Sequence, residues 1–539
     1  MTPVTTLYHL IRADVQERVR RYNFMIALLF TVFVTYLFVP PLDASVYLML
    51  NMGGYRPIYN SAWVGSMVTL LMVEFFPLFG FYFAKGTIEN DLRTGVGAII
   101  ATTPMGKLTY AFGKWLSHVL VFTLMVLLIG LASAALQLLR GEDRALDLWA
   151  LLSPFFIILL PALAFVAAVA VLFECVNELR GGLGNIVYFL VYIVVAISTD
   201  FQGIAVLWPS IYQACSASFA SCSEFRQIDL SSTPLQTLPT FVYPGVAWTT
   251  GLVLSRLAWV VAGGVVVALA GVLFHRFDPS KLSANRATAL ADRIKQALIG
   301  FVSRPPAQTD EPETALAPAA APAIRASQLT APQLLSGSAQ LYPRLFAAEV
   351  RLALKGVPLW WYLGAAGLIA ASLLVSLELA QLLVLPLAWI WPLLIWSALG
   401  AREIRANISQ IVFSGPFPIQ RQLPATWLLG VTVALVMAGG VLLRLLFAGA
   451  WTSAGAVVVG ALFVPSLALA LGSLSGGSKL FEAVYLFLWY MAVVQSIPYL
   501  DYMGRFAETT AWGLPLVYVA LTLLLFGLAV AGRLFHMRH

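Results

Sequence analysis

The sequence is poor in charged residues and in cysteine. Asp, Glu, Lys and Arg make up 11% of its 539 residues, whereas an ordinary soluble chain has about 25%. Three cysteines are too few for a disulfide-stabilised scaffold, and no glycine period of the collagen type occurs. Hydrophobic residues make up 60% of the chain, which excludes a disordered protein and exceeds what a water-soluble fold of this length could bury. We predict an all-α polytopic membrane protein.

Motifs of enzymes and of nucleotide-binding proteins are also missing. No loop of the form GxxxxGK[ST] occurs, and this is the loop whose backbone amides hold phosphates. The five histidines show no metal-binding spacing, and there is no GxSxG turn. We expect no catalytic activity, metal or cofactor in this chain. The net charge of +7 does not indicate nucleic acid, because Lys and Arg beside membrane helices give the same balance.

Apolar runs of about 20 residues predict twelve transmembrane helices. The predicted spans lie near 24–40, 61–84, 115–138, 149–173, 184–207, 248–274, 359–377, 382–399, 425–447, 453–473, 481–498 and 513–532. Most of the Lys and Arg residues fall before the first span, after every second span and after the last. By the positive-inside rule both termini are predicted to be cytoplasmic.

The composition changes between the sixth and the seventh predicted span. Residues 277–343 are rich in Ala, Pro, Ser, Thr and Gln, which predicts a low-complexity cytoplasmic linker. Within it, residues 290–301 have apolar side chains at helical spacing, typical of an amphipathic helix that lies on the inner membrane surface or packs on protein. The linker separates a first six-helix unit, 1–276, from a second, 344–539.

The two halves share short sequence patterns in the same order. The matches are Ala13-Asp14-Val15 with Ala348-Glu349-Val350, Glu89 and Pro104 with Glu403 and Pro418 at the same separation, and Val187-Tyr188 with Val484-Tyr485. Because all three fall at equivalent places between the predicted spans, we predict a duplicated six-helix unit with pseudo-two-fold symmetry.

Two predicted cytoplasmic loops, 85–114 and 400–424, are much longer than a connection between neighbouring helices requires. Each contains a charged turn, an apolar stretch, a proline and then a basic residue. The residues concerned are Glu89, Asp91, Arg93, Pro104 and Lys107 in the first loop and Glu403, Arg405, Asn407, Pro418 and Arg421 in the second. We interpret the loops as surface helices that present charges to a cytoplasmic partner. Solvated loops that merely follow the positive-inside rule are the alternative.

This order of features resembles the permeases of type-two ABC exporters in their fused, two-unit form. The matching residues in the first loop are Glu89, Asp91, Arg93, Gly95, Thr103, Pro104, Lys107, Tyr110, Gly113 and Lys114. The resemblance implies that this loop includes a coupling helix, which docks on an ATPase subunit. The second loop departs from the pattern, since Arg405 stands where the first has Asp91.

The resemblance also implies the partners and the location. Two copies of a separate ABC ATPase, which would hold ATP and magnesium, are expected beside membrane lipids and an unidentified small-molecule, lipid or peptide cargo. The chain itself would be a permease of the bacterial plasma membrane and no enzyme.

Glu74 lies in the middle of the second predicted span, where a charge costs about 2.5–3.5 kcal/mol on insertion scales. It is a candidate for the transport pathway or for proton binding, and a buried structural hydrogen bond beside Pro77 is the alternative. Its counterpart in the second half is the apolar Ala388. A twelve-helix, proton-coupled secondary transporter of the major-facilitator type is the alternative function.

Two of the cysteines, Cys215 and Cys222, share the predicted outer loop 208–247. They could form a disulfide if the exterior is oxidising.

Overall fold

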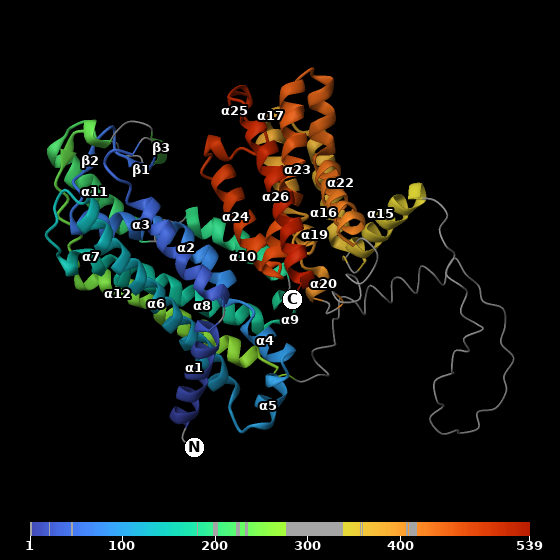
Figure 1. The fold of residues 1–539 in the computed structure, drawn as a ribbon. Coiled ribbons are helices and arrows are strands. Elements are labelled where there is room, and N and C mark those ends of the chain that lie inside the picture. The colour runs from blue at the N-terminus through green and yellow to red at the C-terminus, as the bar shows by residue number, and fades with distance from the viewer. Residues whose placement is uncertain are drawn as a thin grey trace. The chain divides into compact units, whose positions relative to one another are not determined.

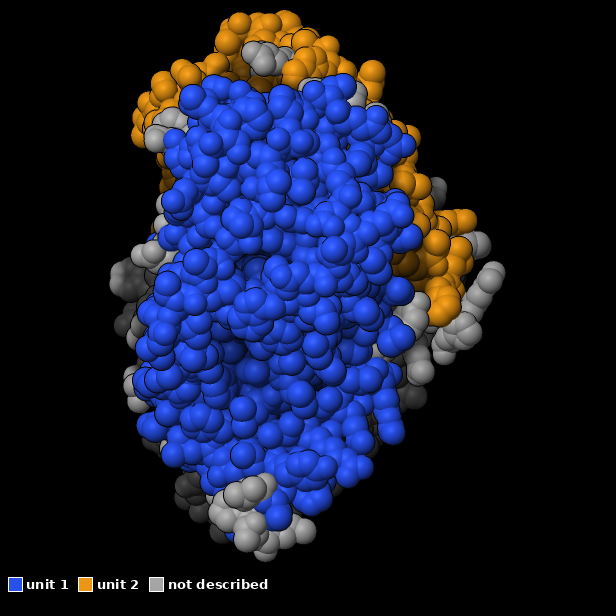
Figure 2. All heavy atoms as spheres, turned by 90° about the vertical axis from the view of Figure 1, so that its left-hand side faces the viewer, with its two compact units in different colours: residues 1–283, 482–500 blue, residues 284–481, 501–539 orange. Residues whose placement is uncertain are grey.

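The computed structural model describes most of the chain. The described residues are 3–20, 22–44, 47–180, 182–197, 203–222, 227–231, 235–275, 277, 338–355, 357, 359–405, 408 and 418–538. The chain divides into two compact units, coloured separately in Figure 2. Unit 1 comprises Met1–Ser283 and Glu482–Leu500, and unit 2 comprises Ala284–Phe481 and Asp501–His539. The segment Glu482–Leu500 thus groups with unit 1, although it lies within the predicted second half.

Seven helices of the described chain are long and apolar enough to cross a membrane. They are Ser61–Arg93, Lys107–Arg140, Leu148–Cys175, Thr250–Leu273, Ile419–Phe447, Trp451–Ser475 and Leu514–Phe535. The protein is therefore a helical, multi-pass membrane protein.

Helices also lie at the other five predicted spans, but these are shorter or broken. They are α2 (Tyr22–Phe38), α10 (Gly182–Ile197), α16 (Leu359–Leu374), α24 (Lys479–Val493) and the succession α17 (Leu377–Leu379), η4 (Ala380–Val384), α18 (Leu385–Ile390) and α19 (Leu393–Trp396). Pro392 interrupts the last of these, because proline has no N–H to donate to the preceding turn. The number of twelve spans stays a prediction.

In unit 1, α6 (Lys107–Arg140) contacts most of the other long helices. Around it pack α1 (Pro3–Val19), α2, α8 (Leu160–Cys175) and α12 (Thr250–Leu273) (Figure 1). Helix α3 (Ser61–Ala84) is buried nearly all round and packs on α7 (Leu148–Pro154), η1 (Phe155–Leu159) and α8. At Gly65 of α3 a Cβ atom would lie 2.3 Å from the carbonyl oxygen of Leu151, so only glycine permits this approach.

In unit 2, α23 (Trp451–Ser475) packs on α22 (Pro418–Phe447) and on α26 (Leu514–Arg538). Helices α15 (Ser338–Leu354) and α16 contact α22. Gly400 lies against α23, where a Cβ atom would be 2.7 Å from the carbonyl oxygen of Leu469. The short helix α25 (Ala507–Ala511) lies between α23 and α26.

Near the N-terminal end of α3, unit 1 carries four short strands that the sequence did not predict. Strand β1 (Tyr47–Asn51) pairs antiparallel with β3 (Gln227–Ser231), and β2 (Arg56–Pro57) pairs parallel with β4 (Thr240–Phe241). In the same region, α11 (Ile204–Ser218) ends beside the disulfide between Cys215 and Cys222, and η2 (Leu235–Thr237) follows β3.

Arg56 forms a two-pronged ion pair with Glu142, the residue that follows α6 by two positions. Its Nη1 and Nη2 atoms lie 2.6 and 2.9 Å from the two carboxylate oxygens, and Tyr59 N donates to the same group. The Arg56 guanidinium lowers the pKa of Glu142, although partial burial opposes this shift.

The predicted linker lies almost wholly outside the described residues. The amphipathic segment 290–301 is among the residues not described, and α15 begins at Ser338, a few positions before the predicted end of the linker at 343.

Candidate functional site

The first long loop forms two short helices between α3 and α6. Helix α4 (Thr87–Arg93) follows Gly86 (φ 102°), and α5 (Val96–Thr102) follows Gly95 (φ 78°). Both glycines adopt left-handed conformations that disfavour other residues, so the chain turns sharply at each. The result is a pair of short helices, here called the α4–α5 element, at the end of α3 (Figure 1).

The first turn of α4 is held by Glu174, at the end of α8. Its carboxylate accepts hydrogen bonds from Thr87 N at 3.0 Å and from Ile88 N at 2.6 Å. Glu174 is 1% exposed, and a carboxylate is favourable beside the unpaired N–H groups of a helix start. This contact fixes the α4–α5 element to α8.

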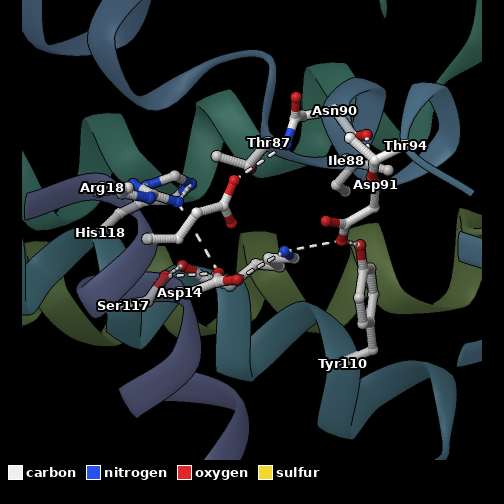
Figure 3. Close-up of polar contacts among 12 residues, drawn as sticks. Asp14, Arg18, Thr87, Ile88, Asn90, Asp91, Thr94, Tyr110, Ser117 and His118 are labelled. Carbon is white, nitrogen blue, oxygen red and sulfur yellow. Dashed lines mark hydrogen bonds and ion pairs between the residues drawn. The ribbon is translucent and has the colours of Figure 1, made fainter. Parts of the chain in front are cut away.

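The buried side of α4 is held by a lysine that two aspartates share. Lys114 Nζ of α6 lies 2.7 Å from Asp91 of α4 and 2.9 Å from Asp14 of α1. Tyr110 Oη donates to Asp91 at 2.6 Å, and Ser117 Oγ donates to Asp14 at 3.1 Å. Figure 3 shows the two aspartates and their hydroxyl partners linked by dashed lines. We call these five residues the lysine cluster.

The lysine cluster needs its compensating charges, because Lys114 is 2% exposed and a buried unpaired ammonium would cost several kcal/mol. Tyr110, Lys114 and Ser117 are three or four positions apart, so they share one face of α6. The cluster joins α1, α4 and α6 through charge-assisted hydrogen bonds.

A second contact between α1 and α6 lies beside the lysine cluster. The Arg18 guanidinium donates to the ring of His118, with Nη2 at 3.4 Å from Nε2, and Arg18 Nη2 lies 3.9 Å from Asp14. Arg18 and His118 are both buried. Helix α1 is therefore anchored to α6 at two successive turns.

The opposite side of the α4–α5 element is exposed. Of the predicted docking residues, Glu89 and Arg93 of α4 are exposed, as are Pro104 after α5 and Lys107 at the start of α6. The fifth, Asp91, is buried in the lysine cluster and does not face the solvent. Two apolar side chains, Val96 (41% exposed) and Ile99 (66% exposed), lie on α5 among these charges.

In the second long loop the described part is smaller. Glu403, in α20 (Arg402–Arg405), is buried, accepts a hydrogen bond from Gln422 at 2.7 Å and lies 3.5 Å from Arg533 of α26. Arg402 pairs with Glu349 of α15 at 2.7 Å. We call these five residues the arginine cluster.

Arg421 lies half-buried on α22. The side chains of Arg405 and Pro418, and the whole of Asn407, lie outside the described residues.

Glu74 of α3 is buried in unit 1, with 1% of its surface exposed. Its carboxylate accepts hydrogen bonds from Tyr490 Oη and from Gln495 Nε2, the latter at 3.0 Å. Tyr192 Oη of α10 donates to the backbone oxygen of Glu74. Sequence reasoning found Glu74 but missed these partners, because they lie more than 100 positions away in the chain.

A second polar layer joins the same helices toward the α4 end of α3. Lys85 Nζ lies 2.5 Å from Asn185 Oδ1 of α10, and Asn185 Nδ2 donates to Glu482 of α24. Lys85 follows Glu74 by eleven positions, which is about 16 Å along α3.

Aromatic rings fill the space between the two polar layers. Phe487 contacts Phe75 and Phe79 at centroid distances of 5.2 and 5.3 Å, and Phe189 contacts Trp489 at 5.5 Å. We call the packing of α3, α10 and residues 482–495 the three-helix contact. It is closed in this structure, with apolar rings between two hydrogen-bonded ends.

Among the described residues, no group of three or more His, Cys, Asp or Glu side chains could hold a metal ion. Comparisons of the chain with protein-family models, with curated proteins and with solved structures found no match.

Proposed function

We propose that this chain is the permease subunit of an ATP-driven exporter and works with two copies of a separate ATPase subunit. The observation that carries the proposal is the two-sided α4–α5 element. Its exposed side offers Glu89, Arg93 and Ile99 to a cytoplasmic partner, and its buried Asp91 is ion-paired to Lys114 of α6, which also pairs with α1. A partner that moves this element would move the spans with it.

Matching contacts in the two units support a duplicated six-helix plan. In unit 1, α1 packs on α6 and α12 packs on α8. In unit 2, α15 packs on α22 and α26 packs on α23 in the same way. Trp115 of α6 donates to Ala164 O of α8, and Trp427 of α22 donates to Ser466 Oγ of α23. Twelve spans in two pseudo-repeated halves would account for these pairs.

The three-helix contact supports a pathway along α3, α10 and α24. Its rings would have to separate for cargo to pass, and once separated they would form an apolar, aromatic surface. A hydrophobic small molecule, lipid or peptide fits such a surface better than an ion does. The exposed cations Arg12, Arg20, Arg93 and Lys107 lie on α1 and α4 or on the residues that follow them, which favours a cytoplasmic location for this end of unit 1 and for the N-terminus.

Affinity purification of the tagged full chain, followed by an ATPase assay, tests the proposal. The variant E89A/R93A/I99E changes only exposed side chains, so membrane insertion and folding should persist. The matched control, D143A/R144A, removes one exposed acid and one exposed base beyond the far end of α6.

The wild type and the control should co-purify with a stoichiometric amount of a partner protein that carries Walker motifs. The amount of this partner recovered with the variant should be at least tenfold lower. A chain that purifies alone, without ATPase activity, would refute the proposal.

The buried Glu74 favours one alternative, a proton-coupled secondary transporter, because an ionisable side chain inside a membrane span is typical of proton pathways. Under this alternative, efflux from cells would stop when an uncoupler collapses the proton gradient and would be lost in Glu74→Gln. Under the main proposal, the chain with Glu74→Gln would still stimulate ATP hydrolysis by the ATPase subunit.

A further inference from the structure

Helix α15 runs across the helix that follows it. It turns into the apolar helix α16 with a bend of 107°, and it packs on α22 in unit 2 (Figure 1). Its Glu349 is buried and paired with Arg402, so one side of α15 is fixed to the protein. If α16 crosses the membrane, as predicted for residues 359–377, this bend places α15 along the membrane surface.

The other side of α15 carries a stripe of exposed side chains, which we call the basic stripe. Its members come from successive turns of the helix, three or four positions apart except for two adjacent pairs, so they lie on one face, and they border one shallow hollow of the surface. They are Arg344, Ala347, Ala348, Arg351, Leu352 and Lys355.

The charge of the basic stripe is of one sign. Its three charged members are all basic, and the single acidic residue of α15 is Glu349, on the buried side. The two alanines lie between the first two cations, which leaves space for a group larger than a water molecule. The three cations follow one another at about 10 and 6 Å along the helix.

Helix α1, which precedes the first predicted span as α15 precedes the seventh, differs on its exposed side. There Arg12 and Arg20 alternate with Glu17, which accepts a hydrogen bond from Asn90 of α4. Mixed charge of this kind has little net attraction for a charged surface. The basic stripe is therefore a property of α15 and not of both such helices.

We propose that the basic stripe binds the phosphate-bearing headgroups of anionic phospholipids in the leaflet along which α15 lies. Arg and Lys bind phosphate oxygens through charge-assisted hydrogen bonds. The exposed Leu352 and Tyr342 can enter the boundary between headgroups and acyl chains. Each cation near an anionic surface increases binding about fivefold, so three together give about a hundredfold preference.

This inference does not rest on the proposed transport function, because it concerns the membrane around unit 2. A label on α15 can report it in the full chain. Cys175 is buried and Cys215 is bonded to Cys222, so Ala348→Cys would be the accessible thiol for a fluorophore.

The experiment places the labelled full chain in nanodiscs that contain trace phosphatidylglycerol or phosphatidylcholine with a nitroxide on the headgroup. In the Ala348→Cys protein, the phosphatidylglycerol probe should quench the label at least tenfold more effectively per mole, and 1 M salt should reduce this preference strongly. The variant R344Q/R351Q/K355Q should show near-equal quenching by the two probes, and the control R12Q/R20Q should keep the preference.

The proposal would be overturned if both probes quenched the label equally in the protein with the unsubstituted stripe. It would also be overturned if the triple substitution left the preference for phosphatidylglycerol intact. If the triple variant does not fold, the single variants R351Q and K355Q serve in its place, and each should reduce the preference for phosphatidylglycerol about fivefold. A stripe that shows no lipid preference, yet is needed for capture of an acidic protein, would identify a protein partner and refute the lipid assignment.

Discussion

The lysine cluster of unit 1 and the arginine cluster of unit 2 compensate two buried carboxylates each, but with different numbers of cations. Each joins a helix that precedes a predicted span to the long loop after the next one. In unit 1 a single cation, Lys114, serves both Asp14 and Asp91. In unit 2 the acids have separate partners, Arg402 for Glu349 and Arg533 with Gln422 for Glu403.

The difference shows that the stability of a fold depends more on a single charged residue when that residue is fully buried. The Lys114 side chain is 2% exposed, whereas that of Arg402 is 23% exposed. Water can therefore reach the space that removal of Arg402 leaves, but not the space that removal of Lys114 leaves. We therefore expect substitutions in unit 1 to cost more stability than equivalent ones in unit 2, and exposed ion pairs to cost least.

The largest effect is expected for Lys114→Met, which keeps the side-chain volume and removes the shared charge. It leaves two buried aspartates facing each other, and breaking a buried pair costs about 3–5 kcal/mol. At roughly 2–4 °C per kcal/mol, the melting temperature should fall by about 10 °C. A thiol-reactive dye measures it in detergent, because Cys175 is buried and reacts only on unfolding.

The matched control is Lys107→Met, which removes an exposed charge from the first turn of the same helix. Its melting temperature should stay within about 2 °C of the wild type, since exposed charges contribute little. An equal loss in both variants would mean that burial of the lysine cluster does not set the cost.

A smaller effect is expected for Arg402→Gln in the arginine cluster. It leaves Glu349 without this partner, but the partly exposed position admits water, so the cost should be about 1–3 kcal/mol. The same dye assay measures it, with Arg351→Gln on the exposed side of α15 as the control. A loss larger than that of Lys114→Met would reverse the comparison between the units.

The smallest effect is expected for the pair of Arg56 and Glu142, whose glutamate side chain is 28% exposed. Glu142→Gln should cost about 1 kcal/mol at pH 7. Because the pKa of Glu142 is lowered in the folded protein, its contribution is complete above the unfolded pKa of about 4.3 and disappears as the pH falls through the lowered value.

Melting temperatures of the wild type and of Glu142→Gln, compared at pH 7, 5 and 3.5, measure this dependence. The two proteins should differ most at pH 7 and converge at the lowest pH. Asp143→Asn, the exposed neighbour, should change the melting temperature at pH 7 by less. A constant difference at all three values would show that the ion pair is not the cause.

The positions of the long helices could be predicted from the sequence, but some of their ends could not. The predicted span 184–207 is divided into α10 and α11, and the second begins after Gly203 in a left-handed conformation. The predicted span 481–498 ends as α24 at Val493, because Ser496 has a positive φ and Pro498 disfavours helix in the residue before it. Hydropathy measures apolar content and does not register such local turns.

The candidate site was predicted in part. The two-helix character of loop 85–114 and the exposure of Glu89 and Arg93 agree with the interpretation from sequence. The burial of Asp91 does not follow from the local sequence, in which Glu89 and Arg93 on the same short helix are exposed. It depends on Lys114, 23 positions away, and on α1, whose Asp14 is 100 positions from that lysine.

The sequence by itself determined that this protein is helical and embedded in a membrane, because the transfer free energy of an apolar helix is a sum over consecutive residues. Only the tertiary structure decided which charges are buried, which segment carries Tyr490 to Glu74, and that residues 482–500 group with unit 1. The free energy of a buried charge depends on a partner, and the fold brings that partner from a distant part of the chain.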